Sequence, residues 1–216
     1  PLVDANQNGQ LITRIKGVRK KLTHEVGFLI PPVHIRDNLE LEPDVYRVML
    51  LGVPVGQAVI HPERLLAINP GNAYGTIDGI AGSDPAFGMD AVWIEPVNRD
   101  QAQSLGYTVV DPSTVMATHL NHILQTHSHD LLGREEVQNL IDSLAKASPK
   151  LVEGFVPDTI SLGLLQQVLK KLLEEDISIR DMRTIIEVLA TEVAVSQDPD
   201  ALTAAVRVAF KRSIFH

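Results

Sequence analysis

The chain has 216 residues, of which 44% are hydrophobic and 21% are charged, a composition typical of a soluble globular protein. A formal net charge of -8 argues against a surface that neutralises nucleic-acid phosphates, so we expect no nucleic-acid partner. The absence of cysteine excludes disulfides and thiolate zinc sites. The given sequence shows no signal-peptide pattern and no apolar run of the roughly 18 residues that span a membrane. The absence of cysteine also fits a reducing compartment, so we expect a cytoplasmic location. Because the chain starts on Pro1, we expect a piece of a longer protein.

The first third of the chain predicts a basic helix followed by a small sheet. Apolar residues repeat at helical spacing over residues 9–25. Short strands are predicted at 33–35, 45–51, 55–60 and 64–68, and the second and third of these form a hairpin around Gly52. We therefore expect a sheet domain at this end of the chain.

A loop-rich region separates this sheet from a second group of elements. Residues 69–88 hold five of the fourteen glycines, and their Pro, Asn and Asp residues favour turns over regular structure. A strand at 91–95, a helix at 98–105 and a strand at 107–110 then follow. This β-α-β pattern predicts parallel strands with a right-handed crossover.

The second half of the chain is predicted to be helical throughout. Ser113 is a candidate N-cap for a helix running to about Asp130, and four apolar stripes at helical spacing follow it. The predicted class is α+β with several subdomains: a small mixed sheet domain, interrupted by an inserted loop-rich β-α-β subdomain and followed by a helical bundle.

Two features of the chain bear on enzymatic chemistry: a group of three histidines and the serine at position 83. His119, His122 and His129 lie within the predicted helix and would offer imidazoles to a metal on one helix face, although no HExxH pattern accompanies them. Ser83 lacks the G-x-S-x-G elbow of a hydrolase. A hydrolase or metal-dependent enzyme using the three histidines is the alternative function; a solvated helix face is the simpler interpretation.

Charge is unevenly spread along the sequence. Residues 37–100 hold ten acidic and three basic side chains, whereas residues 9–24 hold five basic side chains and no acidic one. Solvated faces explain this pattern. The functional interpretation is a basic helix that meets an acidic surface of another subunit.

The stretch DPAFGMDAVWIEP brings two rings close together in a chain poor in aromatics. Trp93 lies within an alternating strand pattern and is expected in the core. Phe87 follows the fixed backbone of Pro85 and precedes Gly88, with Asp84 placed to accept turn amides. The ring of Phe87 is therefore either a plug under the loop or the floor of a binding surface, where aromatic anchors are favoured.

Seven ordered blocks of the sequence closely resemble the cytoplasmic part of the flagella/hypersensitive response/invasion proteins export pore family of type III secretion, its flagellar branch more than its virulence branch. The blocks are GFLIPPVHIRDN, LLAINPG, DPAFGMDAVWI, VVDPSTVMATHLNHIL, LLGREEVQNLID, PKLVEGFVP and ISIRDMRTIIEVLA.

The resemblance implies a division into subdomains. The first would comprise residues 1–62 and 112–131, the second would be inserted at 63–111, and the helical third would occupy 132–216. The fourth subdomain of the family would be absent after about Arg212, and the membrane would be reached only through a missing N-terminal region.

The resemblance also implies a function. The region would be a non-enzymatic docking platform, without cofactor or metal, at the cytoplasmic face of the bacterial inner membrane, where it forms a nonameric ring. Its partners would be export chaperones carrying late substrates and the soluble export ATPase complex. The family's chaperone site maps onto Asp84, Phe87 and Thr118. For the ring interface we expect Arg19, Lys20 and Lys21 to face acidic residues of a neighbouring subunit.

Overall fold

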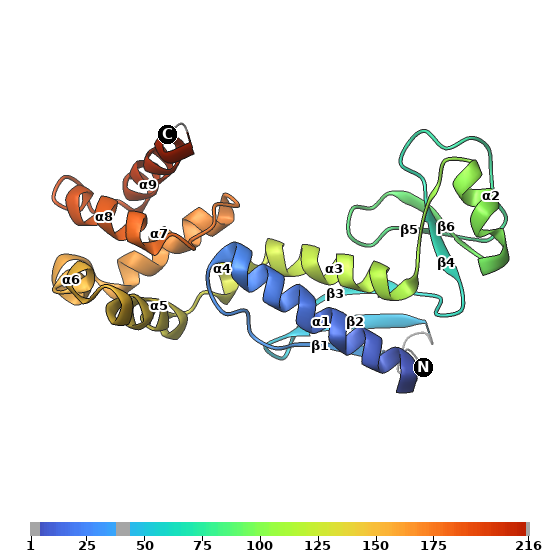
Figure 1. The fold of residues 1–216 in the computed structure, drawn as a ribbon, viewed down its shortest axis with the longest axis horizontal. Coiled ribbons are helices and arrows are strands. Elements are labelled where there is room, and N and C mark those ends of the chain that lie inside the picture. The colour runs from blue at the N-terminus through green and yellow to red at the C-terminus, as the bar shows by residue number, and fades with distance from the viewer. Residues whose placement is uncertain (1–4, 38–43, 215–216) are drawn as a thin grey trace. The chain divides into compact units, whose positions relative to one another are not determined.

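A computed structural model of the chain describes residues 5–37 and 44–214 (Figure 1). The chain divides into two compact units: Pro1–Arg19 with Pro31–Leu124, and Lys20–Ile30 with Gln125–His216. Two long helices, α1 (Ala5–Val26) and α3 (Pro112–Thr126), begin in the first unit and end in the second. The division into three subdomains at residues 62, 112 and 132 stays a prediction.

One sheet of the first unit is a three-stranded meander. Strands β1 (Val33–Asp37), β2 (Val45–Leu50) and β3 (Val53–Val59) pair in this order, and every pair is antiparallel. Leu51 and Gly52 connect β2 to β3 with positive φ angles of 52° and 79°, the conformation that a tight two-residue hairpin requires. The predicted hairpin is therefore confirmed.

The other sheet of the first unit is built from β4 (Leu65–Ile68), β5 (Ile80–Ser83), β6 (Asp90–Ile94) and β7 (Thr108–Val110). The strand order is β5-β6-β4-β7, again with antiparallel pairs only. The 3-10 turn Pro96–Asn98 and α2 (Arg99–Ser104) connect β6 to β7. Because β6 and β7 are both antiparallel to β4, they run in the same direction, as predicted, but β4 lies between them.

Two further details of this sheet differ from the predictions. Strand β5 forms within residues 69–88, where only turns were expected, because it pairs along its whole length with β6. The sheets are antiparallel rather than mixed, because every strand pair in the described part of the chain is antiparallel.

Helix α3 approaches the first sheet closely at Gly56. A Cβ atom at Gly56 in β3 would lie 2.5 Å from Cδ1 of Ile123, so a larger residue there would require the Ile123 side chain to shift. Pro112 begins the helix, and the carboxylate of Asp111 accepts hydrogen bonds from the Ser113 and Thr114 hydroxyls. Asp111, rather than the predicted Ser113, therefore precedes the first turn, because proline suits the first helical position.

The second unit is helical in the residues described. Its stripes of buried apolar side chains face inward from α7 and α8, as in Leu165, Leu169, Leu172, Ile185 and Leu189, confirming the predicted bundle. The elements are α4 (Ser128–Leu131), α5 (Arg134–Ala147), α6 (Pro149–Val152), an irregular turn (Phe155–Thr159), α7 (Leu162–Glu174), α8 (Met182–Glu192) and α9 (Pro199–Ile214).

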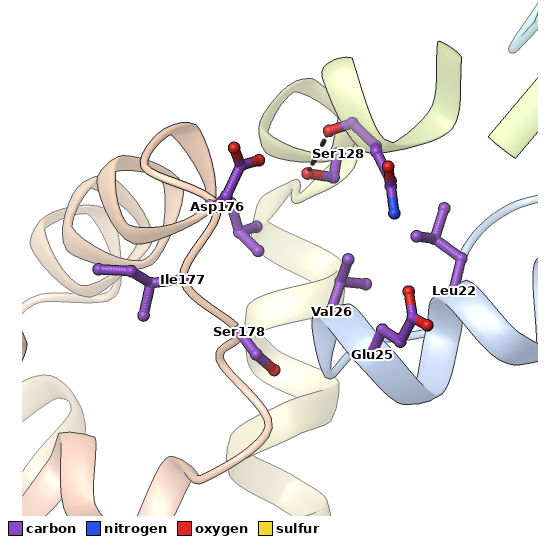
Figure 2. A pocket seen from close by; sticks show the side chains of 9 residues that line it. Leu22, Glu25, Val26, Ser128, Asp176, Ile177 and Ser178 are labelled. Atoms are coloured by element: carbon purple, nitrogen blue, oxygen red, sulfur yellow. Dashed lines mark hydrogen bonds between the residues drawn. The ribbon is translucent and has the colours of Figure 1, made fainter. Parts of the chain in front are cut away.

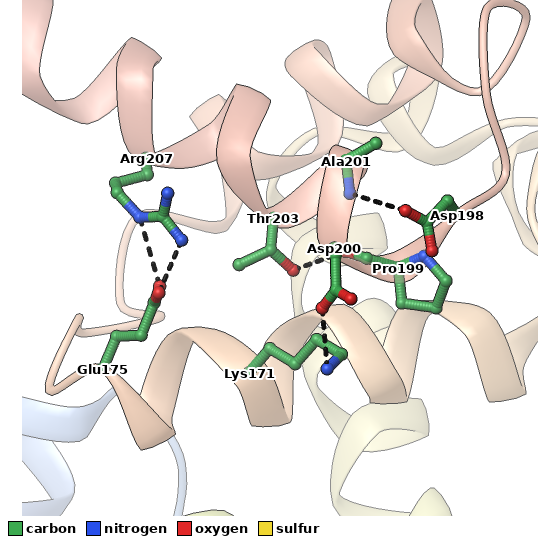
Figure 3. A network of polar contacts seen from close by, with 8 residues as sticks. All are labelled: Lys171, Glu175, Asp198, Pro199, Asp200, Ala201, Thr203 and Arg207. Atoms are coloured by element: carbon green, nitrogen blue, oxygen red, sulfur yellow. Dashed lines mark hydrogen bonds and ion pairs between the residues drawn. The ribbon is translucent and has the colours of Figure 1, made fainter.

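Ion pairs join α9 to α7 at the surface of this bundle (Figure 3). The guanidinium of Arg207 donates to both carboxylate oxygens of Glu175, at 3.2 and 2.5 Å, and Lys171 Nζ lies 2.9 Å from Asp200 Oδ1. The Asp200 carboxylate raises the pKa of Lys171 through this hydrogen bond. Because both pairs are solvent-exposed, they add little to stability.

The α+β class is thus confirmed, with two small antiparallel sheets and a helical unit. Among the residues described, no helix is both long enough and apolar enough to cross a membrane.

Candidate docking surface around Phe87

Asp84 organises the turn that carries Phe87. Its side chain is only 3% exposed, and its carboxylate accepts the backbone N–H of Phe87 at 2.8 Å and that of Ala86 at 3.4 Å. Its carbonyl accepts the N–H of Gly88 at 2.8 Å, where φ is 71°. The carboxylate therefore fixes the backbone under the ring and does not itself face a partner.

Phe87 stands out from this turn with 66% of its surface exposed. Its ring lies edge-on against the imidazole of His122, with 5.5 Å between the centroids. Thr118 is exposed one helical turn before His122 on α3, so the two side chains share one face of that helix. The structure therefore brings the three predicted residues to one region, with His122 as the link between the turn and the helix.

Trp93, by contrast, is buried, with 2% exposure. Its ring contacts the imidazole of His61 at 5.4 Å, and its carbonyl accepts from Arg64 Nη1 at 3.2 Å. The prediction that Trp93 belongs to the core is confirmed. The plug interpretation of Phe87 is wrong, because a plug would be buried.

A buried polar pair lies behind the surface. The hydroxyl of Tyr46 on β2 and Nδ1 of His119 on α3 share a hydrogen bond of 2.6 Å, and the two side chains are 0% and 6% exposed. Burial raises the pKa of Tyr46, and the negative charge of Asp84 adds to this. Burial also lowers the pKa of His119, assisted by the charge of His122 and opposed by that of Asp84. At neutral pH this pair is uncharged.

The three histidines of the alternative function do not form a cluster. Helix α3 ends at Thr126 and α4 begins at Ser128, so His129 is on a different helix from His119 and His122. His129 Nε2 lies 3.4 Å from Asp130, and His119 is bonded to Tyr46. Among the described residues, no group of three or more His, Asp or Glu side chains is arranged to hold a metal. The expected single histidine face is therefore wrong, because the helix breaks at His127.

The predicted ring-interface residues lie on α1. Lys20 and Lys21 are exposed and Arg19 is partly buried. Lys21 Nζ lies 3.8 Å from the carboxylate of Glu25, one turn along the helix. No contact described in this single chain tests whether they meet a neighbouring subunit, and their role stays a prediction.

The second unit contains a pocket of about 240 Å³ that the sequence did not indicate (Figure 2). It combines apolar side chains such as Leu22 and Val26 with the carboxylates of Glu25 and Asp176. Ser128 donates to the carbonyl of Gln125 at 3.1 Å in its wall. The lining residues are Leu22, Glu25, Val26, Gln125, Ser128, Leu173, Asp176, Ile177 and Ser178. These residues come from three separate segments, and no sequence pattern connects them.

Comparison with known proteins identifies the family to which the chain belongs. The model of the FHIPEP family matches residues 1–216, and the chain belongs to that family. Flagellar biosynthesis protein FlhA of Yersinia enterocolitica is 55% identical over 214 residues, which is 99% of this chain and 31% of the relative. The chain thus spans about a third of the length of the curated relatives it matches.

Solved structures agree with this assignment. The complex of Chlamydia pneumoniae CdsV and CdsO contains a chain with a TM-score of 0.79 and 28% identity, and the match covers 93% of this chain and 62% of that one. The nonameric SctV-C of EPEC has a TM-score of 0.69 at 20% identity, covering 95% of this chain and 62% of that chain. At this identity the second match shows the fold alone.

Proposed function

We propose that the chain is a docking module of the flagellar type III protein export gate, binding export chaperones that carry late substrates. The observation that supports this most is Phe87, whose ring is 66% exposed on a turn fixed by the buried Asp84. A large apolar side chain held rigidly at the surface loses little conformational entropy on binding, which is the property of an interface anchor.

The chemistry of the surface suggests the kind of contact it makes. Phe87 offers apolar area to a leucine-type side chain on an amphipathic chaperone helix, and Thr118 offers a methyl and a hydroxyl group beside it. The imidazole of His122 contacts the Phe87 ring edge-on, with 5.5 Å between the two centroids. Asp84 contributes indirectly, since its carboxylate binds the turn amides.

The test is a calorimetric titration of this chain with a flagellar chaperone–substrate complex. We expect Phe87→Ala to weaken the affinity at least about tenfold, because interface anchors contribute about 2 kcal/mol or more. Tyr74→Ala is the matched control, since Tyr74 is another aromatic side chain of the same unit and is 75% exposed. Binding by Phe87→Ala that equals wild type, with an unchanged melting temperature, would show that the assignment is wrong.

Partners beyond the chaperones are part of the same proposal. CdsV, a structural relative, forms a complex with CdsO, and the related SctV-C of EPEC is nonameric. By analogy, we propose that this region meets the soluble export machinery, including its ATPase complex, and self-associates in a ring in the longer protein. The place of action would be the cytoplasmic face of the bacterial inner membrane.

A further inference from the structure

The edge of the second sheet next to Phe87 is open. Strand β5 pairs with β6 on one side, and no strand in the described part of the chain pairs with it on the other. All four of its residues are exposed, including Ile80 at 40%. Unpaired N–H and C=O groups at such an edge are a template for a further strand.

The register shows which backbone groups face this open side. Ser83 lies opposite Asp90, and the next pair continues the register, because the N–H of Asp84 donates to the carbonyl of Met89 at 2.8 Å. Successive residues of an antiparallel strand direct their backbone N–H and C=O groups to opposite sides. The backbone groups of Asp84, Gly82 and Ile80 therefore point toward β6. The N–H and C=O groups of Ala81 and Ser83 therefore point to the open side.

Strand β5 carries neither of the residue types, charged residues and proline, that commonly protect an edge strand. Its sequence, Ile-Ala-Gly-Ser, contains no charged residue and no proline. Natural proteins normally use such residues, or a covering element, to prevent unwanted strand pairing at an exposed edge. An unprotected edge beside an exposed aromatic side chain is typical of a surface that pairs with a partner.

We propose that β5 takes an added strand from the docked complex, an extended segment that carries lysine or arginine. This inference deepens the proposed function and depends on it for the identity of the partner. The position of β5 next to the Phe87 turn supports this proposal, because the strand ends at Ser83, next to Asp84 and four residues before Phe87. A chaperone helix on Phe87 and an extended segment on β5 would then occupy one continuous surface.

Charge complementarity supports a basic segment. The exposed Asp78 and Asp90 stand near the two ends of β5, one before Ile80 and one opposite Ser83. Residues 63–111 together hold seven acidic and two basic side chains. An extended segment with lysine or arginine near its ends would therefore have a carboxylate near each end of β5, which favours association.

The test measures amide hydrogen exchange in this chain, free and bound to a flagellar chaperone–substrate complex. We expect binding to slow exchange at Ala81 and Ser83 at least tenfold. Gly82, which already faces β6, changes much less. Unchanged exchange at Ala81 and Ser83, together with binding that still requires Phe87, overturns this inference and leaves the proposed function standing. Protection at both amides with binding that tolerates Phe87→Ala supports the inference and overturns the role of Phe87.

A pair of variants checks the same contact by affinity. Ala81→Pro removes an N–H that faces the open side, so the β5–β6 pairing is kept and the unit folds. We expect this variant to bind about five- to tenfold more weakly, whereas Ala81→Val, which keeps the N–H, stays within about twofold of wild type. Equal affinities for the two variants would contradict strand addition.

The double variant Asp78→Asn/Asp90→Asn tests the charge of the added segment. We expect it to bind more weakly than wild type, and an unchanged affinity overturns the basic character of the segment.

Discussion

Asp84 contributes to the surface around Phe87 although its own side chain is buried. Two amides of the turn bind its carboxylate, so the position of the Phe87 ring follows from backbone hydrogen bonds rather than from packing beneath it. Trp93 shows the opposite arrangement, since its ring is enclosed between the strands and His61. Two aromatic residues six positions apart thus have different environments: Phe87 is exposed on the proposed docking surface and Trp93 is buried in the core.

The buried His119 predicts how the stability of the fold depends on pH. Burial, with help from the charge of His122, lowers its pKa in the folded chain, so the unfolded chain takes up the proton first as the pH falls. Stability is therefore complete above the ordinary pKa of about 6.5 and declines below it. We expect the free energy of unfolding in urea to fall between pH 7.5 and 5.5, by up to about 1.4 kcal/mol per pH unit.

The variant His119→Gln isolates this contribution. Its free energy of unfolding should depend less on pH than that of wild type over the same interval. His34→Gln, at an exposed position on β1, is the control and should keep the wild-type pH dependence. If His119→Gln and wild type lost stability in parallel, burial of the Tyr46–His119 pair would not be the cause.

Among the helices and their connections, glycine determines how closely two segments can approach. Gly27 ends α1 with a φ of 103°, and its N–H donates to the carbonyl of Thr23 at 3.0 Å. A Cβ atom there would lie 2.4 Å from the backbone nitrogen of Arg180, too close for any side chain. The connection between α7 and α8 can therefore approach α1 only because residue 27 is glycine.

We expect Gly27→Ala to lower the free energy of unfolding by more than about 3 kcal/mol, because backbone strain and a backbone clash add. Gly71→Ala is the control: its φ is 106°, and no atom lies within 4 Å of the added methyl group. Backbone strain alone should lower its stability by about 1–3 kcal/mol. Chemical denaturation measures both, and equal losses would contradict the clash.

The elements that the sequence predicted are those with strong periodicity or strong turn signals. Leu165 and Leu169 mark the buried side of α7 at helical spacing, and Gly52 marks the hairpin. Strand β5 was missed because Ile80-Ala81-Gly82-Ser83 has little strand propensity, and its pairing with β6 alone makes it a strand. The break at His127 gave no proline or glycine signal. Of the site, the resemblance indicated Asp84, Phe87 and Thr118, whereas the role of His122 required the fold.

At the scale of the whole molecule, the uneven charge predicts an effect on assembly. Lys20 is exposed on α1, within a segment where residues 9–24 carry five basic side chains and no acidic one. In the longer protein, we expect Lys20→Glu to weaken ring formation several-fold, because like charges would then oppose each other across the interface.

Sedimentation of the longer protein at several concentrations would measure this effect. Lys150→Glu, an exposed charge reversal on α6, is the control for net charge. A ring that assembles equally well with glutamate at position 20 would remove the basic segment from the proposed interface.

Direct contact at Phe87 is the central claim, and photo-crosslinking in the longer protein tests it most directly. Benzoylphenylalanine placed at position 87 keeps an aromatic ring on the turn, and the same group at position 74 is the control. We expect a covalent product with a flagellar chaperone or its substrate from position 87 and little or none from position 74. No product from position 87, or equal products from both positions, would contradict it.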